Sequence, residues 1–367
     1  MRLTARHCTK AVLRAGVSVL STVTVSAAAL ACSTVAFQQL ERPLLAYNFD
    51  FDTTGAGFLM VNPAGATKRS VMSEDRPAEW TARFGSVTFN QIGPTMPAAG
   101  MNTAGLAVTL MWTDDAVFGG GNGTSIVSEL EFIQRLLDTS ASVDEALAAI
   151  GDVRIEGFVP IHYFLFDRSG TAASVLPGES GYVVHTGDDL PVPALTNTRY
   201  DVLIEEAAAF AGLGGAQPVP AGTPWDGTSS LSRFVIAASA IAEADEATTT
   251  DQAFAVLDEI ANPSTRWQVV FDPADRRIAF RTERGAAERV VAMDDLDMGC
   301  VRRPLSLDLS ALPPGDLIAA LAPVDHDALV ASMSEVFLSL KATAAFGRPE
   351  VVGGLAAGLV GSISCDP

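Results

Sequence analysis

The order of its secondary structure constrains this chain most, because β-rich segments lie towards both ends and helical pairs lie between them. Residues 32–51 (CSTVAFQ, then LLAYNFDF) predict a hairpin that turns near Glu41-Arg42-Pro43, and residues 265–282 predict a second strand–turn–strand unit. Residues 128–153 predict two helices, the second capped by Ser142. Strands and helices grouped in this way indicate α+β layers rather than repeated βαβ units. After about residue 285 the strand pattern is lost, which predicts a C-terminal helical extension.

The N-terminus has the pattern of a cleaved export signal. Residues 15–31 are small and apolar, end in the A-x-A sequence Ala29-Leu30-Ala31, and are short for a membrane helix, which needs about 20 residues. The preceding stretch contains four basic residues and no acidic one, namely Arg2, Arg6, Lys10 and Arg14. We therefore expect cleavage between Ala31 and Cys32. This predicts a periplasmic or secreted protein with no stable membrane insertion and a single domain over residues 32–367.

The charge balance and the absence of motifs exclude several classes of function. The whole chain has 24 basic and 43 acidic residues and a net charge of −19, and loss of the signal lowers this to −23. Such an acidic surface argues against nucleic acid or an anionic membrane as a partner. No HExxH, CxxC or P-loop sequence is present, so we expect neither a metal nor a cofactor.

The cysteines are informative because an exported protein meets oxidising conditions. Cys8 leaves with the signal, so Cys32, Cys300 and Cys365 remain, which is an odd number. The simplest allocation is a Cys300–Cys365 disulfide with Cys32 free. Three free thiols remain the alternative.

Cleavage before Cys32 would place two reactive groups on one residue. The α-amine has a pKa of ~8 and the thiol one of ~8.5, so the amine can act as the base for its own thiol near neutral pH. The competing interpretation is a lipoprotein, in which Cys32 is acylated and the amine is no longer free. Leu30 fits that alternative poorly, because lipoprotein signals usually have a small residue at this position.

Eight segments in order resemble the choloylglycine hydrolase family, closest in character to its exported Gram-negative branch. They are CSTVAF, AYNFDF, GMNTAGLAV, SVDEALAAI, IHYFLFDRSG, LTNTRYD, SRFVIAAS and STRWQVVFD, and they extend from Cys32 to about Thr282. The resemblance implies an αββα four-layer sandwich of the N-terminal nucleophile type. It also implies hydrolysis of a linear non-peptide amide, such as penicillin V or an acyl-homoserine lactone, in preference to a conjugated bile salt. Family members are often tetramers, so a homo-oligomer is expected by analogy.

The resemblance also assigns roles to individual residues. Cys32 would be the nucleophile, and Asp50 would hold its amine or thiol through a charge-assisted hydrogen bond. The side-chain amide of Asn197 and the backbone N–H of Trp112 would bind the oxyanion. Arg233 would supply a fixed cation that favours the thiolate.

Two residues depart from the family pattern near this site. Tyr47 replaces a residue that is commonly Arg or Lys, and a tyrosine cannot depress the thiol pKa as a cation would. Trp112 replaces Asn or Tyr, and its broad apolar side chain suits an acyl or aryl group. Tyr47, Asn48 and Trp112 are expected to line the oxyanion and substrate wall. Because of Tyr47, an exported binding protein that keeps the fold without the chemistry stays an alternative.

Overall fold

The computed structural model describes residues 31–52, 55–120, 123–220, 229–282, 286–300 and 304–365. Of the predicted signal, only Ala31 falls within these ranges. In the part of the chain so described, no helix is both long and apolar enough to cross a membrane.

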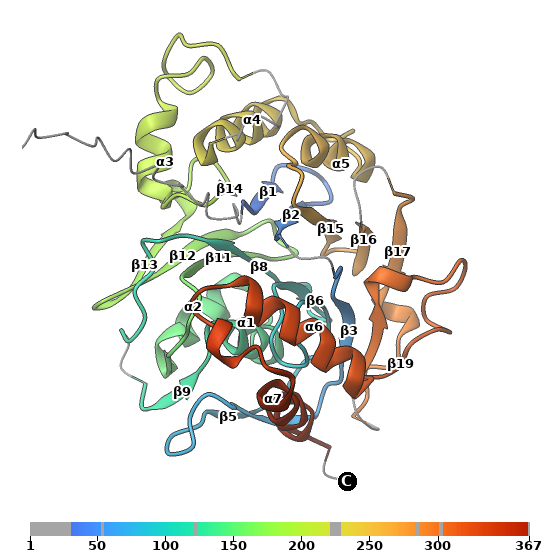
Figure 1. Cartoon of the computed structure of the whole chain (residues 1–367). Coiled ribbons are helices and arrows are strands. Elements are labelled where there is room, and N and C mark those ends of the chain that lie inside the picture. The colour runs from blue at the N-terminus through green and yellow to red at the C-terminus, as the bar shows by residue number, and fades with distance from the viewer. Residues whose placement is uncertain are drawn as a thin grey trace, which may run out of the picture.

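Two antiparallel sheets are stacked face to face, and helices cover both outer faces (Figure 1). The smaller sheet has six strands, in the order β14 (Ala194–Leu195), β1 (Ser33–Phe37), β2 (Leu44–Asp50), β15 (Thr265–Asp272), β16 (Arg277–Arg281) and β17 (Arg289–Ala292). The larger sheet has nine strands, in the order β13 (Gly181–Thr186), β12 (Ala172–Gly178), β11 (Ile161–Phe166), β8 (Ala107–Trp112), β7 (Ala99–Asn102), β6 (Ser86–Asn90), β3 (Phe58–Asn62), β18 (Leu305–Asp308) and β19 (Ala322–Pro323). These layers confirm the α+β sandwich that the sequence predicts.

Small sheets and helices complete the layers. The small sheets are formed by β9 (Ser125–Val127) with β10 (Val153–Ile155), and by β20 (Ile363–Ser364), β4 (Thr67–Arg69) and β5 (Glu79–Thr81). The six-stranded sheet is covered by α3 (Tyr200–Ala207), α4 (Ser230–Glu243) and α5 (Thr250–Glu259). The outer face of the nine-stranded sheet carries α1 (Glu129–Thr139), α2 (Val143–Ala149), α6 (His326–Ser339) and α7 (Pro349–Gly361).

Aromatic side chains hold the two sheets together. Phe89 of β6 lies 5.6 Å from Trp267 of β15 and meets Phe280 of β16 edge-on at 5.4 Å, measured between ring centroids. Aromatic pairs of this kind add about 0.5–1.5 kcal/mol each beyond the burial of their surface. The Thr34 and Thr109 hydroxyls form a hydrogen bond of 2.8 Å between the two sheets.

The predicted hairpins and helix pair are present where the sequence places them. β1 and β2 pair with Ser33 opposite Asn48 and Phe37 opposite Leu44, and β15 pairs with β16. The Ser142 hydroxyl accepts the Glu145 N–H and so caps α2 as predicted.

The segment after about residue 285 differs from the prediction of a helical extension. β17 extends the six-stranded sheet, and β18 and β19 extend the nine-stranded sheet next to β3, so this segment adds strands to both sheets before it becomes helical. These strands have four residues or fewer, too few for alternation to stand out in the sequence. The helical part of the segment consists of α6 and α7, and α7 forms although its four glycines disfavour a helix.

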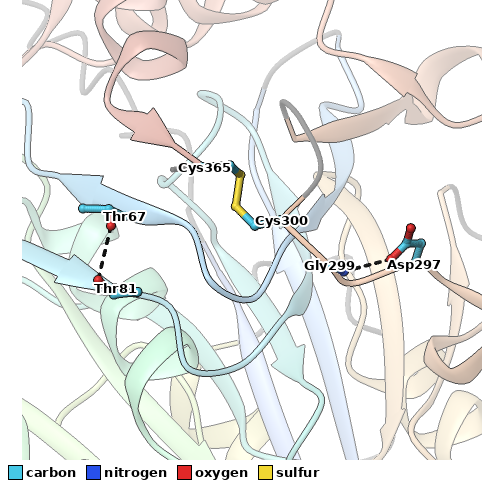
Figure 2. Close-up of a disulfide and its surroundings, with 6 residues drawn as sticks. All are labelled: Thr67, Thr81, Asp297, Gly299, Cys300 and Cys365. Carbon is cyan, nitrogen blue, oxygen red and sulfur yellow. Dashed lines mark hydrogen bonds between the residues drawn. A yellow bond between two sulfur atoms is a disulfide. The ribbon is translucent and has the colours of Figure 1, made fainter. Parts of the chain in front are cut away.

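A disulfide ties the end of the chain to the body of the protein. Cys300 and Cys365 are bonded, which confirms the predicted pair, and Cys32 is the free cysteine of the described residues. Figure 2 shows that Cys365 follows the C-terminal strand β20 and that Cys300 follows the turn in which Gly299 N–H donates to Asp297. The bond therefore fixes the segment that carries α6 and α7.

Loss of this disulfide is expected to lower stability. The two cysteines are 65 residues apart in sequence, and closing a loop of that size is worth about 4 kcal/mol in the chain-entropy model. We expect Cys365→Ser to lower the free energy of unfolding by about 2–4 kcal/mol in denaturant titrations. The control is Ser364→Ala, an exposed neighbour in β20. Equal stability of Cys365→Ser and the parent protein would contradict the prediction.

Candidate active site

Cys32 lies between the two sheets, immediately before β1, and is only 1% exposed. It forms part of the wall of an almost wholly apolar cavity of about 70 Å³. The cavity is also lined by Phe49, Phe51, Gln91, Ile92, Met96, Ala98, Leu110, Trp112, Leu130, Val159, Ile161, Val336 and Leu340. A buried thiol facing an apolar cavity can meet an acyl group without competing water.

The alternation of β2 decides which predicted residues reach the cavity. Phe49 faces the cavity, whereas Asn48 lies on the opposite face, where its amide donates to the Leu257 carbonyl of α5 at 2.8 Å. The prediction that Asn48 lines the substrate wall is therefore wrong, because neighbouring strand residues point to opposite faces. Trp112 does line the cavity, and its indole N–H donates to Asp114.

Arg233 of α4 connects the segments that meet at the site. Its buried guanidinium donates through Nη1 to the carbonyl of Ala31 at 2.5 Å, to that of Cys32 at 2.7 Å and to Ser33 Oγ at 2.5 Å. Nη2 donates to Asn197 Oδ1 at 2.8 Å. Desolvation lowers the pKa of Arg233, and the nearby Asp50 opposes this effect. The guanidinium of Arg233 thus fixes the backbone at Cys32 and the side chain of Asn197 relative to each other, although some 200 residues separate Arg233 from Cys32 in the sequence.

Asn197 and Trp112, the two predicted oxyanion donors, lie side by side. Asn197 Nδ2 donates to the Trp112 backbone carbonyl at 2.9 Å, while its Oδ1 accepts from Arg233. These two bonds fix the orientation of the amide, with its nitrogen directed to the end of β8. The structure therefore brings together Cys32, Asn197, Arg233 and Trp112.

Asp50 is buried beside Cys32, but its carboxylate is bound elsewhere than predicted. Oδ1 accepts from the Thr265 hydroxyl at 2.5 Å and Oδ2 from Asn262 Nδ2 at 2.7 Å. The Cys32 thiol approaches the backbone carbonyl of Asp50 instead, at 3.9 Å. Burial raises the pKa of Asp50 to about 7, while Arg233 and the two hydrogen bonds lower it.

The environment of Cys32 disfavours a thiolate. Burial and, to a smaller extent, the neighbouring Asp50 raise the thiol pKa to about 12, against lowering contributions that include Arg233. At neutral pH the sulfur therefore carries its proton, and a base has to remove that proton during attack.

Tyr47 lies beneath Cys32 with no exposed surface. Its hydroxyl donates to the Leu110 carbonyl at 2.9 Å, and its contact with Cys32 is among the causes that lower the thiol pKa. The hydroxyl has a single proton, and a carbonyl can only accept, so the Leu110 bond uses the proton that a thiolate would need. Tyr47 is not one of the residues that line the cavity.

His162 of β11 supports the segment that carries Asn197. Its Nε2 lies 2.7 Å from the carbonyl of Thr196, so Nε2 carries the proton. Burial lowers its pKa to about 4 from the usual 6.5. His162 is therefore a buried, neutral core residue rather than a catalytic base.

Protonation of His162 is expected to destabilise the protein in acid. Because the folded pKa lies below the unfolded one, the unfolded state binds the proton first, and stability falls as pH drops from about 6.5 towards 4. The loss from this group should reach about 3 kcal/mol at pH 4. We expect His162→Gln to remove that part of the pH dependence in denaturant titrations, and exposed His326→Gln to leave it in place. An unchanged slope in His162→Gln would contradict the assignment.

The partners of Asp50 and the helix that lines the cavity are functional features that the sequence does not predict. Asn262 and Thr265 lie in the sequence NPST, whose last residue begins β15, and a polar cluster at a strand start was the available signal. Val336 and Leu340 come from the C-terminal segment, and nothing in the local sequence indicates that they reach Cys32.

Comparison with known proteins places this geometry in context. The family model of linear amide C–N hydrolases, choloylglycine hydrolase family, matches residues 32–264. Curated proteins give no significant sequence match. Penicillin V acylase from Agrobacterium tumefaciens superposes with a TM-score of 0.68 at 23% identity, over 80% of this chain and 98% of that chain. An arginine-to-leucine variant of conjugated bile acid hydrolase from Clostridium perfringens gives 0.62 at 13% identity, over 76% of this chain and 97% of that chain. At these identities the two structures establish a shared fold.

Proposed function

The chain belongs to the choloylglycine hydrolase family of linear amide C–N hydrolases, and we propose that it is an exported cysteine amidohydrolase that acts through an N-terminal Cys32. The observation that carries the proposal is the junction at Arg233, which bonds to the Cys32 backbone and to Asn197 at the edge of an apolar cavity. A nucleophile, an amide donor and an acyl-binding surface are thereby adjacent. The reaction requires no metal or cofactor.

The proposed reaction has two stages. Cys32 Sγ attacks the amide carbonyl carbon, and the thiol proton passes to the α-amine of the same residue. Asn197 Nδ2 and the Trp112 backbone N–H stabilise the oxyanion. The C–N bond then breaks as the α-ammonium protonates the leaving nitrogen, which yields a thioester and a free amine. Water cleaves the thioester to the carboxylic acid and restores the thiol.

Removal of residues 1–31 is a precondition of this mechanism. While Ala31 is attached, the Cys32 nitrogen belongs to a peptide bond and cannot accept a proton. With a thiol pKa near 12, the sulfur needs that base. Cleavage would also withdraw the Ala31 carbonyl from Arg233, which would still hold the Cys32 carbonyl and Ser33.

The proposed substrate is a small acyl amide that enters by its acyl group. The apolar cavity and the broad Trp112 side chain favour an acyl-homoserine lactone over a conjugated bile salt. Penicillin V, whose acyl group ends in a phenyl ring, is the second candidate. The names of the similar structures, a penicillin V acylase and a conjugated bile acid hydrolase, support this range of acyl amides. We propose a periplasmic or secreted location, as the export signal predicts.

The direct test is a panel of linear amides incubated with the exported protein, with products measured by mass spectrometry. The panel holds phenoxymethylpenicillin, acyl-homoserine lactones and glycine-conjugated bile acids. We expect release of the free acid from at least one acyl amide and an acyl adduct on Cys32. Binding of an amide with neither acid nor adduct would replace this proposal with the binding-protein alternative.

A further inference from the structure

A second cavity lies directly beyond the one that holds Cys32. It measures about 350 Å³, and the two cavities share lining residues from the loop after β6, from α1, from the loop before β11 and from α6. The shared residues are Ile92, Met96, Leu130, Val159, Val336 and Leu340. The two cavities are therefore neighbours, and these six side chains lie between them.

The far side of the second cavity is built by the C-terminal segment. Its lining includes Phe337 from α6, Phe346 from the turn after it, and Val352 and Leu355 from α7. These residues lie beyond 264, where the family match ends. The far side of this cavity is thus built by residues beyond the family match, whereas its near side lies within the match.

The C-terminal helices are fixed over the site by close contacts. Ser332 of α6 donates its hydroxyl to the Gln91 carbonyl at 3.0 Å. Gly93 adopts a φ of +154°, a conformation that favours glycine, and a Cβ there would lie 2.9 Å from the end of the Leu329 side chain of α6, so the loop and the helix pack closely. The Cys300–Cys365 disulfide then anchors the segment beyond α7. The roof of the second cavity is accordingly a built part of the fold.

Most polar groups of the second cavity are engaged by the protein. Ser128 Oγ accepts the Glu131 N–H, and Thr343 Oγ1 donates to the Phe337 carbonyl at 3.0 Å. Glu129 Oε1 accepts the N–H groups of Phe158 and Val159. The remaining lining is almost wholly hydrocarbon, so the cavity fits an apolar group.

The rim of the second cavity is apolar and exposed. Phe158, Phe346 and Val351 line it, and they are 48%, 45% and 43% exposed. The Phe158 and Phe346 rings contact each other at 5.8 Å between centroids. Three large hydrophobic residues left in water at one opening indicate a place where an apolar ligand ends or enters.

The two volumes favour a flexible chain over a ring. A dry cavity of about 150 Å³ holds benzene, so the cavity of about 70 Å³ beside Cys32 is small for a phenyl ring or a steroid. An unbranched alkyl chain is narrower and can pass it. By the same comparison the second cavity has room for on the order of ten further carbon atoms.

We propose that the second cavity is a distal acyl subsite, and that the preferred substrates are amides of long unbranched fatty acids. The carbonyl lies at Cys32, the first methylenes fill the small cavity, and the rest of the chain lies beneath α6 and α7. This inference rests on the proposed amidohydrolase function and assigns a role to the C-terminal segment.

The first measurement is kcat/KM for a series of acyl-homoserine lactones from butanoyl to tetradecanoyl, repeated with the 4-nitroanilides of the same acids. Each methylene moved from water into the cavity contributes about 0.8 kcal/mol, which is about fourfold in kcat/KM. We expect this rise over the chain lengths that fill the second cavity. A flat profile would overturn the proposal.

Matched variants locate the effect. Leu355→Trp should fill the space of about three methylenes and lower kcat/KM for the dodecanoyl amide about 60-fold, with little change for the butanoyl amide. Val351→Trp, at the exposed rim, should act in the same direction and tolerates the added bulk. Ala357→Trp, exposed on α7 and outside the lining, is the control and should change neither. Equal loss on short and long substrates in both cavity variants would overturn the proposal.

Binding to the inactive protein separates this inference from the proposed function. Dodecanoate is titrated calorimetrically into Cys32→Ala protein with and without Leu355→Trp. Weaker binding in the double variant supports the subsite even if no amide is hydrolysed. Identical binding, or none, overturns it even if hydrolysis of short amides confirms the enzyme.

Discussion

Cys32→Ala is expected to lower kcat by about five to six orders of magnitude, the size of effect seen when a covalent nucleophile is removed. The side chain lies in the wall of the apolar cavity, and in the proposed reaction only its sulfur bonds to the acyl carbon. The substitution removes one buried atom, so we expect a cost in stability of about 1 kcal/mol and a folded protein. The measurement is single-turnover hydrolysis of the best substrate in the amide panel.

Cys32→Ser is the informative companion variant. It keeps the α-amine after cleavage and replaces the thiol with a weaker nucleophile, so slow acyl transfer should remain above the Ala level. Unfolding titrations establish that both variants are folded. Residual activity of Cys32→Ala above about one hundredth of the parent rate would contradict nucleophilic catalysis by Cys32.

Asn197→Ala is expected to lower kcat by about 10²–10³, the usual cost of one oxyanion donor. Arg233 and the Trp112 carbonyl orient the Asn197 amide, so the donor is preorganised. Its loss therefore raises the free energy of the transition state. KM should change little, because the oxyanion does not exist in the bound ground state. The measurement is the steady-state separation of kcat from KM on one amide.

Asn48→Ala provides a matched control for Asn197→Ala. Both side chains are asparagines that donate to a backbone carbonyl near the nucleophile, but Asn48 points to α5 on the face away from the cavity. We expect Asn48→Ala to lower stability and leave kcat nearly unchanged. Comparable losses of kcat in the two variants would indicate that Asn197 acts only through packing.

Local sequence patterns predicted the parts of the fold that depend on local rules. The β1–β2 hairpin follows from alternation and a turn at Pro43, and α2 follows from the Ser142 cap. β17, β18 and α7 depend instead on pairing and packing with residues far away in sequence. A four-residue strand or a glycine-rich helix has no local pattern strong enough to predict it.

The site divides in the same way. The chemistry of Cys32 could be argued from its position after a cleavage sequence, whereas Arg233 and Asn197 came from family resemblance, because only the tertiary fold brings them to Cys32. The strand register decides on which face of β2 each side chain lies. Asn48 points to α5, whereas its neighbour Phe49 points into the cavity. The carboxylate of Asp50 binds Asn262 and Thr265, contacts that cross more than two hundred residues.

The central claim is that Cys32 becomes a free N-terminal residue, and the intact mass of the exported protein tests it most directly. We expect a mass that starts at an unmodified Cys32, together with one acyl group added to that residue after mixing with a slow amide substrate. A lipid on Cys32, or a chain that starts elsewhere, would remove the base from the nucleophile and contradict the proposed mechanism.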